Sequence, residues 1–423
     1  MAGLKVIILA AGKSTRMKSA LPKVLHEVAG KPILAYVLEQ AQSLDPSGIV
    51  VVAGHQADRV KGAFTGLPKT SFVIQEPQLG TAHAVMQARE ALQQAAASDE
   101  DVLVLCGDVP LLKHDSLARF HAEFKESGAA ASVLTAIYHD PTGYGRIVRD
   151  GSGSLRQIVE EKDCLPEFRS IKECNTGTYL FKAGFLLSTL DSIKPNNAQK
   201  EYYLTDAVQV LFLQDKPVAT TVLEAQEEVI GINTRRDLAM ADAIARGWIM
   251  LDLLENKGVS LVDPATTYIE ADVEIGQDTV VLPFSCIRRG VKIGKGCTVG
   301  PFAHLRPGTV MEDGTKIGAF VEAKNAHLME GATAGHMAYL GDVSIGRDVN
   351  IGAGTVVANY DGRKKHKTVI EDEAFIGCGT VLVAPVTIGK GAITGANTVV
   401  PKNKDVRAGA TVVGAPAREI GKK

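Results

Sequence analysis

The sequence contains little of what marks several common protein classes. Aromatic residues make up 5% of the chain, and the six cysteines are scattered without a CxxC pair or a disulfide-like spacing. The formal net charge of −2 argues against nucleic-acid binding as the main task. The low aromatic content suits a core filled by isoleucine and valine rather than by large rings.

Long apolar runs are missing as well. No stretch approaches the roughly 18 apolar residues that a membrane helix needs, and no signal peptide precedes the first strand-like segment. We therefore expect a soluble, cytoplasmic protein that neither inserts into a membrane nor binds nucleic acid, and that acts on small-molecule substrates. At 423 residues the chain is long enough for two or three domains.

A six-residue repeat is the strongest pattern that the chain does have. This period fits neither an amphipathic helix nor an alternating strand. It predicts a parallel β-helix, in which three short strands form one coil and each sixth residue points into a narrow core. A glycine-rich β-sandwich would not hold one register over nine successive hexads. The repeated aliphatic positions are Ile269, Ile275, Val281, Ile287, Ile293, Val299, Leu305, Met311 and Ile317, then Ile370, Ile376, Leu382, Ile388, Val400, Val406 and Val412.

The chain before this repeat has a different pattern. Residues 1–232 alternate strand-like segments (5–9, 49–53 and 102–105) with helix-like segments such as 33–41, which is typical of a doubly wound α/β domain.

An amphipathic helix is expected over residues 234–257, because apolar residues recur there at three- and four-residue spacing. We expect it to link the two large domains and to pack on one of them. The predicted organisation is a Rossmann-like domain over 1–232, a linker helix over 233–257 and a β-helix over 258–423. The expected apolar face of the helix consists of Leu238, Ala241, Ile244, Ala245, Trp248 and Leu251.

Small residues follow the first strand directly, in the run Leu9–Gly12. Such residues let backbone N–H groups approach a ligand closely, and the loop can hold phosphates before the next helix. The spacing matches neither the P-loop nor the GxGxxG fingerprint, which disfavours both classes. A glycine-rich turn is usually structural, but Arg16 and Lys23 add the positive charge that a triphosphate needs.

A carboxylate ends another buried strand, in the run Cys106–Leu111 (CGDVPL). Ligands of open α/β sheets bind at the carboxyl ends of the strands. A lone aspartate at a strand end is more often a helix cap, but this context favours Asp108 as a Mg²⁺ ligand.

These two motifs resemble the signature of sugar-1-phosphate nucleotidyltransferases. Over its full length the chain is similar to the bifunctional N-acetylglucosamine-1-phosphate uridyltransferase/glucosamine-1-phosphate acetyltransferase family. The resemblance implies a site for UTP and UDP-N-acetylglucosamine in which Arg16 and Lys23 are catalytic. Its residues are Leu9, Ala10, Ala11, Gly12, Lys23, Gln75, Gly80, Thr81, Cys106, Gly107, Asp108, Gly145, Glu160, Asn175 and Asn233.

The resemblance also divides this site into parts. Gln75 and the segment 78–84 would recognise uracil, Gly145, Glu160 and Asn175 would contact the acetamido sugar, and the loop 197–205 would close over the sugar. Asp108 and Asn233 would bind Mg²⁺, which prefers such oxygen ligands. The implied reaction is in-line attack by the sugar phosphate on the α-phosphorus of UTP, a step that depends on positioning and charge neutralisation.

The six-residue repeat is interrupted between Val321 and Thr368 by polar and charged residues. A β-helix can be a mere scaffold, but interruptions of a repeat usually map to binding loops. The resemblance implies that His336 is the general base of an acetyltransferase, a role that suits the pKa of histidine, with Glu322 as a candidate to orient it. Arg306, Lys324, Tyr339 and Asn350 would bind glucosamine 1-phosphate. Ala353, Asn359, Tyr360, Lys365, Cys378 and Ala396 would line the acetyl-CoA side of the site.

The chain departs from the family pattern at two places. The stretch from Asp263 to Pro301 looks shorter than usual, as though a coil or more were missing. The basic residue near the family's C-terminus has no clear counterpart, and Arg418 is a candidate contact for coenzyme A. The resemblance also implies a left-handed coil, although parallel crossovers are otherwise right-handed, and a homotrimer with acetyl-transfer sites between subunits.

Two other functions remain as alternatives. The first is a monofunctional sugar-1-phosphate nucleotidyltransferase with a structural or regulatory β-helix, which His336, Lys324 and Arg306 argue against. The second is a non-catalytic regulatory subunit, which would tolerate loss of Arg16, Lys23 or Asp108, although all three are present.

Overall fold

The computed structural model describes residues 3–13 and 15–420. Contacts divide the chain into two compact units that meet between Asp242 and Ala243, within the long helix α8 (Arg235–Glu255). The domain boundaries at 232 and 257 stay a prediction.

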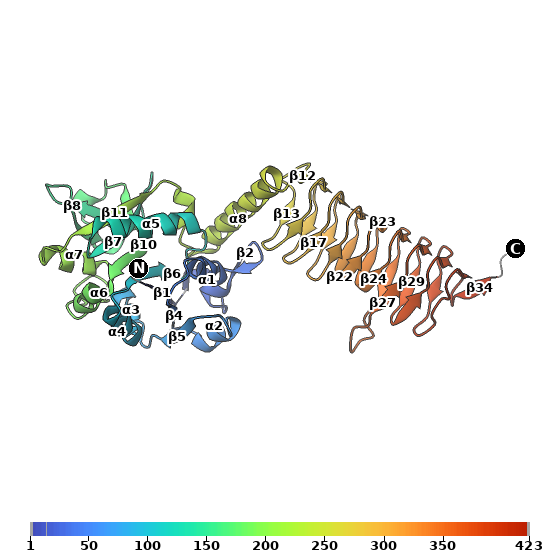
Figure 1. Cartoon of the computed structure of the whole chain (residues 1–423), viewed down its shortest axis with the longest axis horizontal. Coiled ribbons are helices and arrows are strands. Elements are labelled where there is room, and N and C mark those ends of the chain that lie inside the picture. Colours follow the sequence, from blue (N-terminus) through green and yellow to red (C-terminus); the bar gives the residue numbers. More distant parts are fainter. Residues whose placement is uncertain (1–2, 14, 421–423) are drawn as a thin grey trace. The chain divides into compact units, whose positions relative to one another are not determined.

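A mostly parallel sheet forms the centre of the first unit, in the order β11-β7-β10-β6-β1-β4-β5 (Figure 1). Strand β10 runs antiparallel to its neighbours β6 and β7. The strands predicted from the sequence are confirmed as β1, β4 and β6. The bounds are β1 Leu4–Ala10, β4 Gly48–Ala53, β5 Thr70–Ile74, β6 Asp101–Cys106, β7 Ala131–Ile137, β8 Arg146–Arg149, β9 Leu155–Val159, β10 Glu173–Lys182 and β11 Val218–Leu223, with a small hairpin of β2 Glu27–Val28 and β3 Lys31–Pro32.

Helices cover both faces of this sheet. Successive strand residues point to opposite sides, so each face has its own buried cluster. Ile7 and Val104 belong to one buried cluster, whereas Ile8 and Leu105 belong to the other. The predicted doubly wound α/β fold is confirmed. The helices are α1 Ile33–Ser43, α2 Ala57–Ala63, α3 Thr81–Met86, α4 Arg89–Ala97, α5 His114–Ser127, α6 Ala183–Leu190 and α7 Asp206–Leu213; the 3-10 turns are η1 Thr15–Met17, η2 Lys23–Leu25, η3 Glu161–Asp163, η4 Pro166–Phe168 and η5 Gln226–Val229.

Short parallel strands stack coil on coil in the second unit, which is the predicted β-helix (Figure 1). One face consists of β12 Ser260–Leu261, β15 Val280–Val281, β18 Thr298–Val299, β21 Lys316–Ala319, β23 Thr333–His336, β25 Asn350–Ile351, β28 Phe375–Ile376, β31 Ile393–Thr394 and β33 Thr411–Val413, with β34 Arg418–Ile420 antiparallel at the end. The next consists of β13 Tyr268–Ile269, β16 Cys286–Ile287, β19 His304–Leu305, β22 Glu322–Leu328, β24 Tyr339–Ile345, β26 Val356–Ala358, β29 Val381–Val383 and β32 Val399–Val400. The third consists of β14 Glu274–Ile275, β17 Lys292–Ile293, β20 Val310–Met311, the second halves of β22 and β24, β27 Thr368–Ile370 and β30 Val386–Ile388.

The register of the strands explains both the repeat and its interruption. Tyr268, Cys286 and His304 lie side by side at intervals of eighteen residues, which is three hexads per coil. The interval is seventeen from Glu322 to Tyr339 and again from Tyr339 to Val356, and it then rises to twenty-five between Val356 and Val381. A loop over residues 359–367 accounts for the longer coil. The aliphatic residues of the hexads are buried in one continuous core, as predicted.

The apolar face expected for helix α8 is partly wrong. Leu251 is 51% exposed, whereas Leu253 is buried and Ile249 and Met250 pack against the core of the β-helix. Three- and four-residue spacing identifies an amphipathic helix, but contact with the first coils decides which side of its last turns is covered. In the part of the chain that the structure describes, no helix is both long enough and apolar enough to cross a membrane.

Candidate active sites

A cavity of about 460 Å³ opens where strands β1 and β6 of the α/β unit end. Loops that follow parallel strands line it, as is usual in open α/β sheets. Besides many of the residues predicted to bind nucleotide, the lining contains His55, Gln78 and Glu201. The predicted residues found in the lining are Leu9, Ala10, Ala11, Gly12, Lys23, Gln75, Gly80, Thr81, Cys106 and Asp108.

Two cationic side chains lie beside this cavity, together with two side-chain oxygen atoms that could bind a metal ion. Lys23 Nζ forms an ion pair with the Asp108 carboxylate and donates to Asn233 Oδ1 at 3.1 Å. Arg16 Nη2 donates to the same Asn233 oxygen at 2.9 Å. The carboxylate and the amide oxygen therefore face a common point. This donor set fits Mg²⁺, although among the described residues no group of three His, Cys, Asp or Glu side chains is placed to hold a metal ion.

Hydrogen bonds fix the positions of Asp108 and Asn233, the two residues that carry these oxygen atoms. Ile232 N donates to Asp108 O at 2.9 Å, which brings Asn233 beside the end of β6. Asn233 N and Thr234 N both donate to Asp237 Oδ2, at 2.9 and 2.8 Å, and Asp237 N donates to Thr234 Oγ1 at 3.2 Å. This reciprocal capping holds Asn233 at the start of helix α8.

The segments predicted to recognise uracil and to cover the sugar lie against each other. Gln75 is buried, and its Nε2 donates to Gly80 O at 2.9 Å. Gly80 has a φ of +111°, and a Cβ there would lie 2.4 Å from Tyr202 O, so the position requires glycine. Tyr202 N donates to Leu79 O at 2.7 Å, and Ala82 N donates to Tyr202 O at 2.9 Å.

The three residues predicted to contact the acetamido sugar also lie together, outside the lining of the cavity. Asn175 N donates to Gly145 O at 2.9 Å. A Cβ on Gly145 would lie 3.6 Å from both Asn175 Cβ and Glu160 Cδ. Asn175 Nδ2 donates to Tyr179 Oη at 2.7 Å, and its Oδ1 accepts from Gly177 N at 3.0 Å, so its orientation is set.

Burial and like charge shape the ionisation of groups around the sugar residues. Desolvation raises the pKa of Glu160, and the carboxylates of Asp206 and Asp163 add to this effect. Desolvation also raises the pKa of Asp206 to about 6, with the charge of Asp163 as the second cause. Burial raises the pKa of Cys106 to about 12, so this thiol in the cavity wall is not a nucleophile at neutral pH.

In the β-helix, strand register brings several predicted acetyl-transfer residues onto one face. Glu322 lies beside Tyr339 in the next coil, and Arg306 Nη1 donates to Glu322 Oε1 at 2.7 Å. A Cβ on Gly341 would lie 2.7 Å from the Tyr339 hydroxyl and 2.8 Å from Asn359 Nδ2. These two side chains therefore converge over a glycine, next to the Arg306–Glu322 pair.

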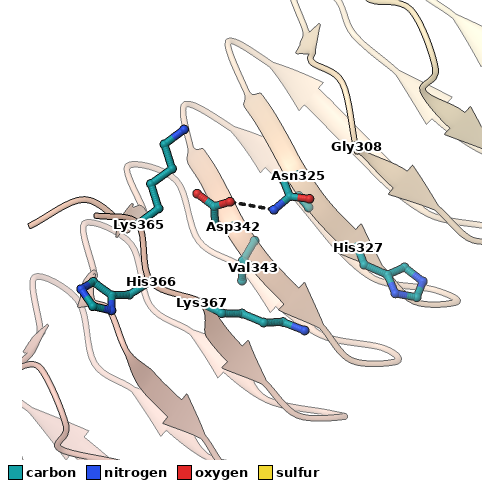
Figure 2. A pocket seen from close by; sticks show the side chains of 9 residues that line it. Gly308, Asn325, His327, Asp342, Val343, Lys365, His366 and Lys367 are labelled. Atoms are coloured by element: carbon teal, nitrogen blue, oxygen red, sulfur yellow. Dashed lines mark hydrogen bonds between the residues drawn. The ribbon is translucent and has the colours of Figure 1, made fainter. Parts of the chain in front are cut away.

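Positive charge gathers where the loop over residues 359–367 folds back. Lys324 lies beside Gly341 in the register, and a hydrogen bond and repulsion from Lys365 lower the pKa of Lys324. A cavity of about 320 Å³ lies along this loop (Figure 2), and Lys365 lines it. On its wall, Asn325 Nδ2 donates to Asp342 Oδ1 at 2.7 Å. Two neighbouring ammonium groups favour an anionic ligand between them.

One corner of the coils carries His336 and three of the residues predicted to line the acetyl-CoA side, Ala353, Cys378 and Ala396. His336 and Cys378 are both exposed there. Ala353, Cys378 and Ala396 follow His336 along a single line, in the direction of the C-terminus. Backbone hydrogen bonds of 2.7–2.9 Å join the turns 336–337, 353–354, 378–379 and 396–397 of successive coils.

Some predicted residues are not brought together within one chain. Asn350 pairs with Thr333 and Phe375 on the face that precedes the corner, whereas Tyr339 lies on the face that follows it. Side chains on two faces of a coil point outward in different directions, so one chain does not present both to the same sugar. Tyr360 is 60% exposed, and its hydroxyl donates to Gly362 O within its own loop.

Comparisons with known proteins match this division into two parts. Residues 6–170 match the model of the MobA-like NTP transferase domain, and residues 290–323 and 367–402 match that of the bacterial transferase hexapeptide (six repeats). The bifunctional protein GlmU of Trichlorobacter lovleyi is 44% identical to this chain, over 95% of the chain and 94% of its own length. The chain belongs to the GlmU family.

Other members of the GlmU family are similar over nearly the whole chain too. The bifunctional protein GlmU of Syntrophomonas wolfei is 41% identical, and that of Fervidobacterium nodosum is 44% identical; each match covers 95% of this chain and, respectively, 95% and 92% of the relative. Each match therefore covers most of both units.

Several residues at these sites were given no role from the sequence. Glu201 lies in the loop 197–205 and Asp342 in the interruption between Val321 and Thr368, so the sequence offers a signal for both. His55 lies outside every motif, and only the fold places it at the nucleotide cavity. Glu322, expected as the partner of His336, pairs with Arg306.

Proposed function

We propose that this GlmU-family chain is a bifunctional enzyme of UDP-N-acetylglucosamine biosynthesis. The β-helix transfers an acetyl group from acetyl-CoA to glucosamine 1-phosphate. The α/β unit then transfers a uridylyl group from UTP to the N-acetylglucosamine 1-phosphate formed, with release of pyrophosphate. One observation carries the proposal: a single chain holds two separate clusters of substrate-binding chemistry, one in each unit, in a family whose relatives are named bifunctional.

In the uridylyl transfer, an oxygen of the sugar phosphate attacks the α-phosphorus of UTP, and the bond to pyrophosphate breaks. Lys23 and Arg16, which both donate to Asn233 Oδ1, would neutralise the triphosphate. Asp108 and Asn233 would hold Mg²⁺, with phosphate oxygens and water completing its ligands; the bound ion supplies further charge neutralisation. No side chain acts as a nucleophile, so the chain contributes position and charge.

Recognition of the two substrates is divided between neighbouring segments. Gln75 and Gly80 support the uracil side, and Gly145, Glu160 and Asn175 support the sugar side. The contact of Tyr202 with the Gly80 turn joins the two sides, so that the sugar loop and the nucleotide pocket form one surface.

In the acetyl transfer, His336 removes a proton from the ammonium group of glucosamine 1-phosphate. The amine then attacks the thioester carbonyl, the C–S bond breaks, and coenzyme A leaves as the thiol. Histidine suits this step because its ordinary pKa lies near neutral pH. Arg306 and Lys324 would supply the charge that holds the sugar phosphate, with Lys365 on the acetyl-CoA side.

A row of exposed apolar side chains supports assembly as a homotrimer. Phe284, Phe302 and Phe320 stack in successive coils, with ring centroids 4.9 and 5.0 Å apart, and Met337 continues the row. These four side chains, the phenylalanine ladder, are 45–62% exposed. Exposed apolar rows mark interaction surfaces, and a second copy would add the wall that the His336 corner needs. The number three follows from the resemblance. Sedimentation as a monomer at micromolar concentration would contradict it.

The decisive test supplies the purified protein with glucosamine 1-phosphate, acetyl-CoA, UTP and Mg²⁺, and follows free thiol and pyrophosphate separately. Both products are expected, with pyrophosphate dependent on prior thiol release. Pyrophosphate formation from N-acetylglucosamine 1-phosphate without any thiol release would instead support the monofunctional alternative. Since both donors are cytoplasmic metabolites, the proposed reactions favour a cytoplasmic location.

A further inference from the structure

The turn from Glu160 to Asp163 is connected to both loops that border the predicted sugar site. On one side, Glu161 Oε2 accepts from Gly143 N at 3.1 Å and pairs with Arg146 Nη2 at 2.8 Å. The turn begins directly after β9 and carries Glu160 at its first position. The loop that contains Gly145 is thereby held beside Glu160.

On the other side, Asp163 reaches the loop predicted to close over the sugar. Its Oδ1 accepts from Ala198 N at 2.9 Å. Within this loop, Asn197 Oδ1 accepts a hydrogen bond from Glu201 N at 3.1 Å. Glu201 lines the nucleotide cavity. A single carboxylate oxygen thus ties the sugar side of the site to a loop that continues into the nucleotide side.

The surroundings of Asp163 are unfavourable for a carboxylate. Its Oδ2 is buried and has no hydrogen-bond partner within residues 3–13 and 15–420. Its charge raises the pKa values of Asp206, Glu160 and Tyr203, in each case in addition to desolvation. A half-satisfied carboxylate among other acidic groups costs stability, so a purely structural origin does not account for an aspartate here.

We propose that Asp163 is a positioning residue for uridylyl transfer, which holds the loop 197–205 closed over the sugar 1-phosphate through its bond to Ala198. The proposal rests on the proposed function of Glu160 and Asn175 at the sugar side. Without this tether the loop opens, the affinity for the sugar 1-phosphate falls, and the reaction itself proceeds at its former rate once the substrate is bound.

Two substitutions separate the tether from the charge. Asp163→Ala removes both, whereas Asp163→Asn removes the charge and keeps an Oδ1 that can accept from Ala198 N. Asp150→Ala is the matched control, since Asp150 also accepts from backbone N–H groups (Ser152 and Ser154, at 2.9 and 3.0 Å), but at the opposite end of the β8–β9 hairpin.

The experiment measures steady-state pyrophosphate release by the full-length protein, with N-acetylglucosamine 1-phosphate and UTP varied in turn. For Asp163→Ala we expect the KM for the sugar phosphate to rise about tenfold, with kcat and the KM for UTP within about twofold of wild type. Asp163→Asn and Asp150→Ala are expected to stay within about threefold of wild type throughout.

Hydrogen exchange of the loop amides provides a readout that does not depend on activity. Residues 198–204 should exchange faster in Asp163→Ala than in wild type or in Asp163→Asn. An unchanged sugar KM, equal effects of Ala and Asn, or a parallel rise of both KM values would each overturn the proposal. If the wild type releases no pyrophosphate, the proposed function fails, while the exchange data still decide whether Asp163 holds the loop.

Discussion

The two predicted sites use the chain in opposite ways. The nucleotide site collects residues from Leu9 to Asn233, which strand ends and loops of the α/β unit bring into one cavity and to its border. The acetyl-transfer site uses the stretch from Arg306 to Ala396, and its residues lie on the outer surfaces of successive coils. The first site is a pocket with walls from one chain, and the second is a corner with two diverging faces.

This difference shows how each fold produces a site. An open sheet has loops of any length at its carboxyl edge, and these loops can fold over a ligand. A β-helix has short, regular turns, so it presents a row of side chains but no enclosing wall. The interrupted coil at residues 359–367 supplies part of a wall, and we expect a second copy to supply the remainder.

The strongest test of whether the two sites act independently is to inactivate each site alone. The first variant is His336→Ala. Without its general base the acetyl transfer should slow by about 10³-fold, while pyrophosphate release from N-acetylglucosamine 1-phosphate stays at the wild-type rate. His139→Ala is the control, because His139 is an exposed histidine of the α/β unit, outside the β-helix. Thiol release above a tenth of the wild-type rate in His336→Ala would remove this residue from its assigned role.

The reverse experiment is Asp108→Asn. Loss of the carboxylate charge should weaken metal-dependent uridylyl transfer by at least about 100-fold, with thiol release unaffected and partial recovery at high Mg²⁺. Asp140→Asn serves for comparison, since Asp140 is exposed and caps its own turn through Thr142. An Asp108→Asn protein with normal pyrophosphate release would show that the metal is held elsewhere.

A charge within the phenylalanine ladder tests whether only the β-helix site needs a second copy. Phe302→Glu should lower thiol release about tenfold at micromolar protein, in parallel with dissociation seen by sedimentation. Pyrophosphate release should not change. Leu213→Glu, at a 73% exposed position on α7, should alter neither. Full thiol release by a dissociated Phe302→Glu protein would mean that one chain completes the site.

The smallest expected effect concerns the pH dependence of stability. The pKa of Asp206 is about 6 in the folded chain and about 3.9 in an unfolded one. The folded state therefore binds more protons between these values, and the stability contributed by the protonated group is lost as the pH rises through about 6. Since Asp206 is partly exposed, solvent screening reduces this loss to about 1 kcal/mol.

Asp206→Asn should remove this pH dependence. Calorimetric unfolding at pH 4 and pH 7 should show the variant gaining about 1 kcal/mol relative to wild type at the higher pH. For Asp150→Asn, the change in stability relative to wild type between pH 4 and pH 7 should have the opposite sign, because hydrogen bonds from Ser152 lower the pKa of Asp150. Equal pH dependence of Asp206→Asn and wild type would indicate that Asp206 stays charged in the folded protein.

Much of the fold could be predicted because its signals are local. The hexad from Ile269 onward, the buried strands and the helix before the repeat all follow from side-chain periodicity. The prediction that Leu251 is covered was wrong because this property is not local. Periodicity shows that a helix has an apolar side, but the neighbouring coils decide which residues of the last turns are covered. For the sites, motifs indicated Lys23, Asp108 and His336, whereas nothing local pointed to His55.

The sequence by itself determined that an α/β region precedes a coil of hexads, and that phosphate-binding and acetyl-transfer motifs lie in different regions. It could do so because strand, helix and hexad periods are properties of the local backbone. Only the tertiary structure decided that Lys23 faces Asp108 and Asn233, that Asp163 holds Ala198, and that Asn350 and Tyr339 lie on different faces of the coils. These relations depend on how strands distant in the chain pair and in which register, and no local pattern encodes that pairing.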